Sequence, residues 1–311
     1  MNELMKVLVA YDPSDRPQPL LDELQRAGLP REAEVVVISV VDVDAPPFPD
    51  DVISSISVND RLNTVLRARK QAFYDVVMKD RDKAFHAVSD ALQSALRASE
   101  LIKSVFPAWD VSAEAYADSP VQAVIKKADD WGADLIVVGT HKQSSLERFI
   151  LGSVSQKVVN EASRSVRVAR SSFYEGESPA RILVGLDGSF FAEKAAQSVA
   201  KRAWPARSEV RLVTVTKPFG MYGVAPDEQR NRATEAQKPV EAALREAGLK
   251  VSSVIREGDA KSALVAESES WGADCIFVGS RGLHRAFLRF FLGSVSGAAV
   301  ANATCSVEVV R

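Results

Sequence analysis

Two kinds of hydrophobic pattern alternate along the chain. Short, mainly apolar segments rich in Val, Ile and Leu occur at residues 5–10, 35–41, 134–139 and 166–169, and again at 181–186, 210–216, 251–255, 274–279 and 307–310. Between them, apolar residues recur every three or four positions, as at Phe191, Ala192, Ala195, Ala196 and Val199. Uninterrupted runs are typical of strands covered on both faces, and the longer spacing is typical of helices with one buried face. The alternation predicts an α/β fold with a doubly wound parallel sheet.

The chain carries this pattern twice. Residues 131–140 match residues 271–280, and a Gly-Ser-Val-Ser segment at 152–155 recurs at 293–296. Solenoid proteins have repeat units of roughly 20 to 50 residues, so a repeat of this length indicates duplicated domains.

We expect the first repeat to span residues 1–172 and the second repeat to span residues 178–311. The first repeat is roughly 35 residues longer, because the offset between matching residues is 175 at Asp12 and Asp187 but 141 at the Gly-Ser-Val-Ser segments. Helical spacing predicts two helices in an insertion at about 51–105. The insertion is either a helical cover over one face of the sheet or an arm that binds a protein partner.

Charge and composition narrow the classes of function. The chain has 39 basic and 41 acidic residues and a net charge of −2, so we expect no nucleic-acid partner. No apolar run reaches 18 residues and no signal sequence is evident, so we expect a cytoplasmic protein without a membrane partner. Cys275 and Cys305 lie in separate apolar runs without Cys-x-x-Cys spacing, and we expect buried thiols at both.

Polar and glycine-rich segments follow the predicted strands of the second repeat. Asp187 and Gly188 follow its first strand, and residues 279–282 follow its fourth. Ligands of a doubly wound sheet bind at the carboxyl ends of its strands. Glycine lets the backbone approach a phosphate closely, and the first amides of a helix are unpaired donors. The segment 293–296, with two hydroxyls and a predicted helix behind it, is a second candidate for binding an anion.

At these residues the sequence resembles the universal stress protein family, over nearly its full length and in tandem form. The family's nucleotide-binding signature is Gly, two residues, Gly, nine residues, Gly, and then Ser or Thr. The second repeat has Gly279, Gly282, Gly293 and Ser294, with ten residues between the middle pair. The first repeat has the spacing of nine, but Lys142 replaces the second glycine.

The resemblance implies two tandem domains, each a five-stranded parallel sheet of strand order 3-2-1-4-5 with helices on both faces. It also implies ATP or another adenine nucleotide bound over the first and fourth strands. Asp187, followed by Gly188, would face the adenosine or an accompanying Mg²⁺ ion, and Thr216 would hold the adenine edge through its backbone. The residues that would hold ribose and phosphates are Gly279, Arg281, Gly282, Gly293, Ser294, Val295 and Ser296.

The matching positions of the first repeat form a more degenerate motif. They are Asp12, Val41, Gly139, His141, Lys142, Gly152, Ser153, Val154 and Ser155. Pro13 stands where the family has glycine, which removes a donor amide and fixes φ at about −65°. We therefore expect nucleotide chiefly in the second repeat.

The expected function is that of a stress-response protein that binds adenine nucleotide and acts as a ligand-responsive module. The sequence contains neither a Walker lysine motif nor Gly-x-Ser-x-Gly, so fast catalysis is not expected. One alternative is slow ATP hydrolysis. The other is an interaction protein in which both nucleotide motifs are empty and the insertion is the working surface. His86, His141 and His284 lack the paired spacing of a structural zinc site.

The last strand of each repeat is expected at an edge of its sheet. Residues 165–169 and 306–310 would then expose unpaired backbone groups, which tend to find a partner. The resemblance implies that this strand pairs across a two-fold axis in single-domain relatives. We expect the two strands to pair with each other within one chain, giving a pseudo-dimer.

Overall fold

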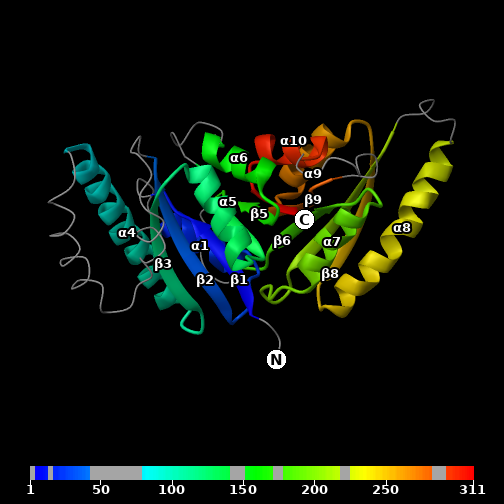
Figure 1. The fold of residues 1–311 in the computed structure, drawn as a ribbon. Coiled ribbons are helices and arrows are strands. Elements are labelled where there is room, and N and C mark those ends of the chain that lie inside the picture. The colour runs from blue at the N-terminus through cyan, green and yellow to red at the C-terminus, as the bar shows by residue number, and fades with distance from the viewer. Residues whose placement is uncertain are drawn as a thin grey trace. The chain divides into compact units, whose positions relative to one another are not determined.

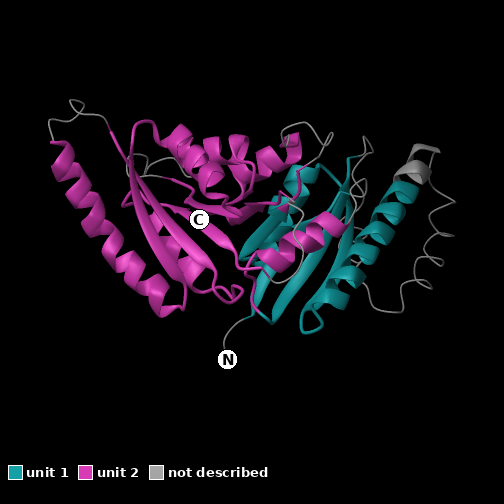
Figure 2. Ribbon diagram, turned by 180° about the vertical axis from the view of Figure 1, so that it is seen from behind, with its two compact units in different colours: residues 1–17, 31–137 teal, residues 18–30, 138–311 magenta. Residues whose placement is uncertain are grey.

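The computed structural model describes residues 4–12, 17–42, 79–140, 151–170, 178–217, 225–281 and 292–311 (Figure 1). The chain divides into two compact units (Figure 2). Unit 1 contains residues 1–17 and 31–137, and unit 2 contains residues 18–30 and 138–311. The boundary between the units therefore does not follow the boundary between the repeats, because unit 2 includes parts of the first repeat.

Unit 1 is built on parallel strands. Its elements are β1 (Met5–Ala10), β2 (Ala33–Val41), β3 (Asp110–Ala117), β4 (Leu135–Val138), α4 (Lys79–Val105) and α5 (Pro120–Trp131). The strand order is β3-β2-β1-β4. In the register of the parallel pairs, Val7 lies opposite Val35 and Val35 lies opposite Val111. Val7 and Val9 of β1 and residues 35–38 of β2 are buried, as the apolar runs predict.

Unit 2 contains the whole second repeat and the end of the first. Its strands are β5 (Ser165–Val168), β6 (Arg181–Gly185), β7 (Glu209–Thr216), β8 (Lys250–Glu257), β9 (Cys275–Gly279) and β10 (Ser306–Val310). Its helices are α1 (Pro17–Arg26), α6 (Ser153–Glu161), α7 (Phe190–Ala200), α8 (Pro226–Glu246), α9 (Ala260–Trp271) and α10 (Ser294–Asn302). Within the second repeat the strand order is β8-β7-β6-β9-β10, which confirms the expected order 3-2-1-4-5.

Helices cover both faces of the sheet in the second repeat. On one face, the small buried residues Ala192, Ala195 and Ala196 of α7 pack against β6 and β9, and Leu244 brings α8 onto the same cluster. Figure 1 shows α9 and α10 on the other face, where they contact each other. The three- and four-residue spacing read from the sequence is the buried face of α7.

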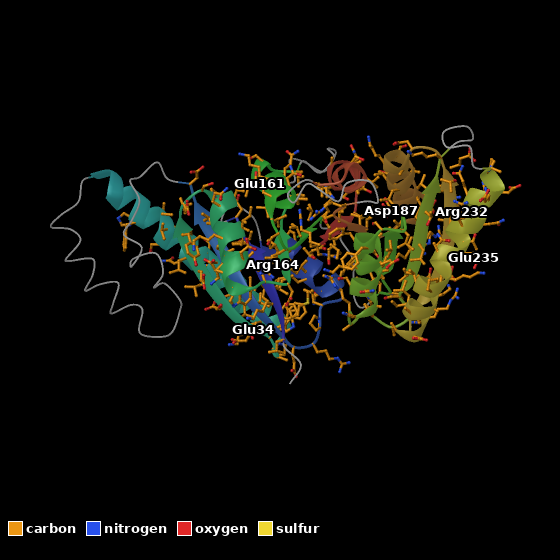
Figure 3. All side chains as sticks on the ribbon, turned by 45° about the vertical axis from the view of Figure 1, so that its right-hand side comes forward. Glu34, Glu161, Arg164, Asp187, Arg232 and Glu235 are labelled. Atoms are coloured by element: carbon orange, nitrogen blue, oxygen red, sulfur yellow. The ribbon has the colours of Figure 1, made fainter. Side chains whose placement is uncertain are left out.

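The outer face of α8 carries charged side chains, among them Arg232 and Glu235 (Figure 3). Arg232 forms an ion pair with Glu228, and Lys238 lies 2.6 Å from Glu235. Exposed pairs of this kind contribute little to stability. No helix in the part of the chain that the structure describes is long and apolar enough to cross a membrane.

Helix α4 accounts for the second half of the predicted insertion. Val88, Ala91 and Leu92 of α4 pack against Val41 and Ala115 of the sheet, so this helix is a cover over β2 and β3. It has the same place in the chain order as α8, between the second and third strands of its repeat. The additional length of the first repeat therefore falls largely between β2 and α4. Residues 51–78 of the predicted insertion lie outside the described residues.

Strand β5 pairs with β10, and this pair is antiparallel, unlike the other described strand pairs of unit 2. Val168 lies opposite Val307, Arg167 opposite Glu308, and Val166 opposite Val309. The last strands of the two repeats are thus hydrogen-bonded neighbours within one chain, and each removes an exposed edge from the other.

Both cysteines are free and buried, as their sequence context predicts. Burial raises the pKa of the Cys275 and Cys305 thiols to about 12. In the unfolded chain a thiol titrates near pH ~8.5. The unfolded state therefore loses these protons at a lower pH than the folded state does, and the folded state loses stability as the pH rises above that value.

We expect the free energy of unfolding to fall more steeply with pH in the wild type than in a Cys275→Ala/Cys305→Ala double variant. The difference in slope between pH 9 and 11 should approach about 1.4 kcal/mol per pH unit for each thiol. Urea unfolding of both proteins at several pH values measures it. Parallel slopes would show that the thiols are not protected from ionisation by the fold.

Candidate functional site

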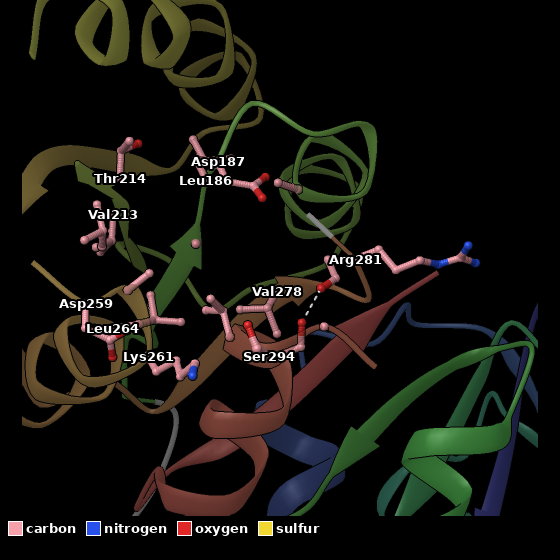
Figure 4. A pocket seen from close by; sticks show the side chains of 18 of the residues that line it. Leu186, Asp187, Val213, Thr214, Asp259, Lys261, Leu264, Val278, Arg281 and Ser294 are labelled. Carbon is pink, nitrogen blue, oxygen red and sulfur yellow. Dashed lines mark hydrogen bonds between the residues drawn. The ribbon is translucent and has the colours of Figure 1, made fainter. Parts of the chain in front are cut away.

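A pocket of about 520 Å³ lies at the carboxyl ends of β6, β7 and β9 in unit 2 (Figure 4). The strand order changes direction between β6 and β9, and ligands of doubly wound sheets bind at such a point. Small-molecule sites typically have volumes of about 300–1,000 Å³. The pocket is therefore where the topology predicts a ligand, and its size suits one.

One part of the pocket wall is apolar. It consists of Leu186, Val213, Leu264 and Val278, each buried and each at or near the end of a strand or on α9. In the sequence these residues are indistinguishable from ordinary core, because each continues an apolar run or the buried face of a helix. Their side chains give the pocket a surface that suits a flat, apolar ring.

The start of α10 forms another part of the wall. Gly293 precedes the helix in an extended conformation, with φ −63° and ψ 153°, and no side chain caps the helix. The first hydrogen bond of the helix runs from the amide of Gly297 to the carbonyl of Gly293, at 2.8 Å. The amides of Ser294, Val295 and Ser296 thus have no intrahelical acceptor, and all three residues line the pocket. Such a helix start attracts anions.

The two hydroxyls of this segment differ in their availability. Ser294 is exposed and lines the pocket. Ser296 is buried, and its hydroxyl donates to the carbonyl of Gly279 at 2.6 Å. In the first repeat, Ser155 donates to the carbonyl of Gly139 at 2.8 Å. In both repeats the hydroxyl of the last serine of the motif therefore bonds the start of a helix to the end of a strand. Its hydrogen is not available to a phosphate.

Two glycines of the signature are required by packing. A Cβ on Gly279 would lie 2.6 Å from the backbone carbonyl carbon of Phe191 and 2.8 Å from the amide nitrogen of Ala192. A Cβ on Gly293 would lie 3.2 Å from the carbonyl oxygen of Ser280. Glycine at 279 lets the end of β9 approach the start of α7. Gly282 lies outside the described residues.

Asp187 lines the pocket from the end of β6, and one of its carboxylate oxygens accepts a hydrogen bond from the amide of Ser189 at 3.0 Å. Gly188 has φ +75°, which favours glycine, and it does not line the pocket. No group of three His, Cys, Asp or Glu residues gathers to hold a metal ion within the described ranges. A Mg²⁺ ion beside Asp187 would therefore take its other oxygen ligands from the nucleotide and from water.

Two lysines that the sequence motifs did not indicate also line the pocket. Lys217 directly follows β7, and Lys261 is the second residue of α9; both line the pocket. Figure 4 shows Lys261 and Ser294 in the lower part of the view and Thr214 and Asp187 in the upper part. Both lysines follow strand ends, where the site residues expected from the sequence were mainly aspartates and glycines. Each could attract a phosphate.

The structure places Arg281 at the pocket with its side chain against Phe191. It lines the pocket, but its guanidinium lies 4.9 Å from the ring centre of Phe191 and extends away from the other labelled side chains (Figure 4). Its carbonyl oxygen accepts a hydrogen bond from the hydroxyl of Ser189 at 3.3 Å. The side chain is therefore engaged outside the pocket.

Thr216 does not line the pocket; Val213, Thr214, Val215 and Lys217 represent this segment there. The carbonyl of Thr216 accepts a hydrogen bond from the amide of Gly258 at 2.9 Å, as β7 and β8 are paired to that point. The carbonyl of Thr216 is thus already bonded within the sheet, and the expected backbone contact to an adenine edge stays a prediction.

The candidates of the first repeat are divided between the units. Asp12 and Val41 lie in unit 1, after β1 and at the end of β2. Gly139 and residues 152–155 lie in unit 2, where α6 begins at Ser153 after an extended residue with φ −62° and ψ 153°, as α10 does. His141 and Lys142 lie outside the described residues.

A family model and individual known proteins both match this chain, and they agree on the family. The model of the universal stress protein family matches residues 3–170 and again residues 180–311. The universal stress protein Rv2005c of Mycobacterium tuberculosis is 30% identical over 210 residues, 65% of this chain and 69% of that protein. A universal stress protein of Mycolicibacterium smegmatis is 29% identical over 187 residues, 58% of this chain. That alignment spans 62% of the relative, less than two thirds of its length.

Among solved structures, a universal stress protein of Archaeoglobus fulgidus superposes with a TM-score of 0.61 at 19% identity. The superposition covers 98% of each chain, and at this identity it shows the fold alone. The two matches of the family model together cover nearly all of the sequence. The chain therefore belongs to the universal stress protein family, with two family domains in tandem.

Proposed function

We propose that the second repeat binds an adenine nucleotide, ATP foremost, in the pocket at the ends of β6, β7 and β9, and that the protein acts as a ligand-responsive module. The observation that carries the proposal is the uncapped start of α10, which lines the same pocket as the apolar wall. A nucleotide has a flat, largely apolar base at one end and phosphates at the other. The pocket offers a matching surface to each.

The phosphate end would meet donors of three kinds. The amides of Ser294, Val295 and Ser296 are helix-start donors, and the hydroxyl of Ser294 lies beside them. Lys261 and Lys217 add positive charge to the lining. Asp187 is the acidic residue of the lining that directly follows the first strand, which suits the Mg²⁺ that accompanies ATP. We propose Asp187, Ser294, Val295, Ser296 and Lys261 as contacts.

The pairing of β5 with β10 supports a second part of the proposal. The last strands of the two repeats join within one chain, so a second chain is not needed to complete either edge. We propose that the chain is an intramolecular pseudo-dimer, and that ligand binding in the second repeat is transmitted through this sheet.

ATP titration of three full-length variants tests the nucleotide site. We expect Lys261→Ala and Ser294→Ala each to weaken binding about tenfold, because each removes a charge-assisted contact to phosphate. The matched control is Ser153→Ala, the same change at the same motif position of the first repeat, which should leave the second-repeat affinity unchanged. Calorimetry measures all three. No binding at millimolar ATP, or wild-type affinity in both test variants, would refute the proposal.

A further inference from the structure

The pairing of β5 with β10 places equivalent residues of the two repeats face to face. The offset of 141 residues that relates the two Gly-Ser-Val-Ser segments also relates Arg167 to Glu308 and Val168 to Val309. In the antiparallel register, Arg167 lies opposite Glu308, and Val166 lies opposite Val309. A residue that lies opposite its own equivalent sits on a local two-fold axis. The axis therefore passes between Arg167 and Glu308.

Contacts on either side of this axis repeat. Arg170 and its equivalent Arg311 are largely buried, and each donates a guanidinium hydrogen bond to the last turn of the other repeat's helix. The acceptors are the carbonyls of Val300 in α10 and Val159 in α6, which are themselves equivalent. A cation at a helix end stabilises its unpaired carbonyls. These two contacts of the interface are thus symmetric.

On the axis itself the symmetry is broken by charge. Arg167 and Glu308 are each only 1% exposed, and their side chains lie 3.3 Å apart. Glu23 of α1 lies 2.6 Å from Arg167, and Arg202 lies 2.5 Å from Glu308. The four side chains form a neutral line of alternating sign. Burial alone would lower the pKa of the Arg167 guanidinium, but the carboxylates of Glu23 and Glu308 outweigh this effect and raise it.

The sizes of two residues that meet at this interface, Gly28 and Trp204, are also complementary. Gly28 follows α1 with φ +62°, and a Cβ on it would lie 2.6 Å from the indole of Trp204. The amide of Ala203 donates to the carbonyl of Gly28 at 2.9 Å. The offset of 175 makes Ala203 the equivalent of Gly28. A copy of the second repeat would thus present a side chain where Trp204 meets a glycine.

We infer that the β5–β10 interface is heterotypic: it fits the edge strand of the other repeat and rejects a second copy of its own. Pairing of β5 with β5 from another chain would bring two Arg167 side chains together. Pairing of β10 with β10 would bring two Glu308 side chains together. Either change replaces a buried ion pair by a buried contact between like charges, which is strongly unfavourable. The structure thereby selects the intrachain partner.

Two charge-reversed variants of the full chain test the inference. Arg167→Glu sets an acid against Glu308, and Glu308→Arg sets a base against Arg167. We expect each to lower the folding equilibrium constant at least about a hundredfold, as for a broken buried pair. Arg167→Met, the control, removes the charge without adding a third acid beside Glu23 and Glu308, so it should cost clearly less than Arg167→Glu. Equal losses in these two variants would mean that packing, not charge, matters here.

The two charge-reversed variants are complementary to each other. When the two variants are refolded together, residue 167 in the β5 of each chain can lie opposite a residue 308 of the other sign in the β10 of the other chain. We therefore expect a complex with one copy of each variant. Light scattering measures the mass of the complex, and capture of an untagged variant by a tagged one measures its formation. Both measurements can be made even if each variant alone fails to fold. Wild-type stability of either variant alone, or a mixture that behaves as the sum of its parts, would overturn the inference.

Discussion

Replacing Ala260 by tryptophan is expected to weaken ATP binding at least about a hundredfold. Ala260 is the first residue of α9, partly exposed, and lines the pocket. An indole at this position would occupy space that the proposed site reserves for the nucleotide. Because Ala260 is not part of the buried core, the variant should fold. Loss of binding would then report on the pocket alone.

Ala266→Trp is the matched control. It makes the same change on the same helix, at an exposed position that does not line the pocket. Calorimetric titration of ATP into both variants, with urea unfolding to confirm similar stability, gives the comparison. Wild-type affinity in Ala260→Trp would place the nucleotide elsewhere on the protein. Equal loss in both variants would indicate a general effect of the indole on the fold.

Replacing Gly279 by valine is expected to destabilise the protein by about 3 kcal/mol or more. A Cβ at this position would lie 2.6 Å from a backbone atom of Phe191, and no side-chain rotation can relieve that contact. The end of β9 or the start of α7 must move. Gly279 therefore belongs to the packing of the fold, whether or not a nucleotide binds beside it.

Gly297→Ala serves as the control for this prediction. The nearest atom to its Cβ would be a side-chain carbon of Leu292 at 3.6 Å, an ordinary contact, and the residue lies inside α10. Alanine there should be neutral or stabilising by up to about 1 kcal/mol. Urea unfolding separates the two outcomes. A Gly279→Val variant as stable as the wild type would mean that the close approach of strand and helix is not tight in solution.

Much of the fold could be predicted from sequence because its signals are local. Uninterrupted apolar runs mark the strands, and the alanine spacing of α7 marks the buried face of that helix. The repeated Gly-Ser-Val-Ser segment located the starts of α6 and α10. The insertion was less predictable, since helical spacing alone did not distinguish α4, which has a counterpart in α8, from the residues before it.

The site was only partly predictable. The backbone segment at 293–296 is at the pocket, but Lys217 and Lys261 follow other strands, and only the parallel topology brings them to the same edge. The contact expected at Thr216 stays a prediction, and the sequence does not reveal that the carbonyl there is bonded to the amide of Gly258. Hydroxyls also look alike in a sequence, although Ser294 is exposed and Ser296 is bonded to Gly279.

The charges on the two-fold axis gave no sequence signal. Glu23, Arg167 and Glu308 are each separated by more than a hundred residues; Arg167 and Glu308 each stand between two valines of a strand, and Glu23 follows Asp22 on a helix. A single charge in such a pattern is usually a solvated side chain. Only the register of β5 against β10 reveals that Arg167 and Glu308 neutralise each other.

The central claim is that the pocket of the second repeat binds ATP. A crystal structure of the full chain, from crystals grown with millimolar ATP and Mg²⁺, tests it most directly. We expect the base against Leu186, Val213 and Val278, and the phosphates at the amides of the first turn of α10 near Lys261. A nucleotide bound at another place on the chain, or this pocket filled by solvent at saturating ATP, would contradict the account.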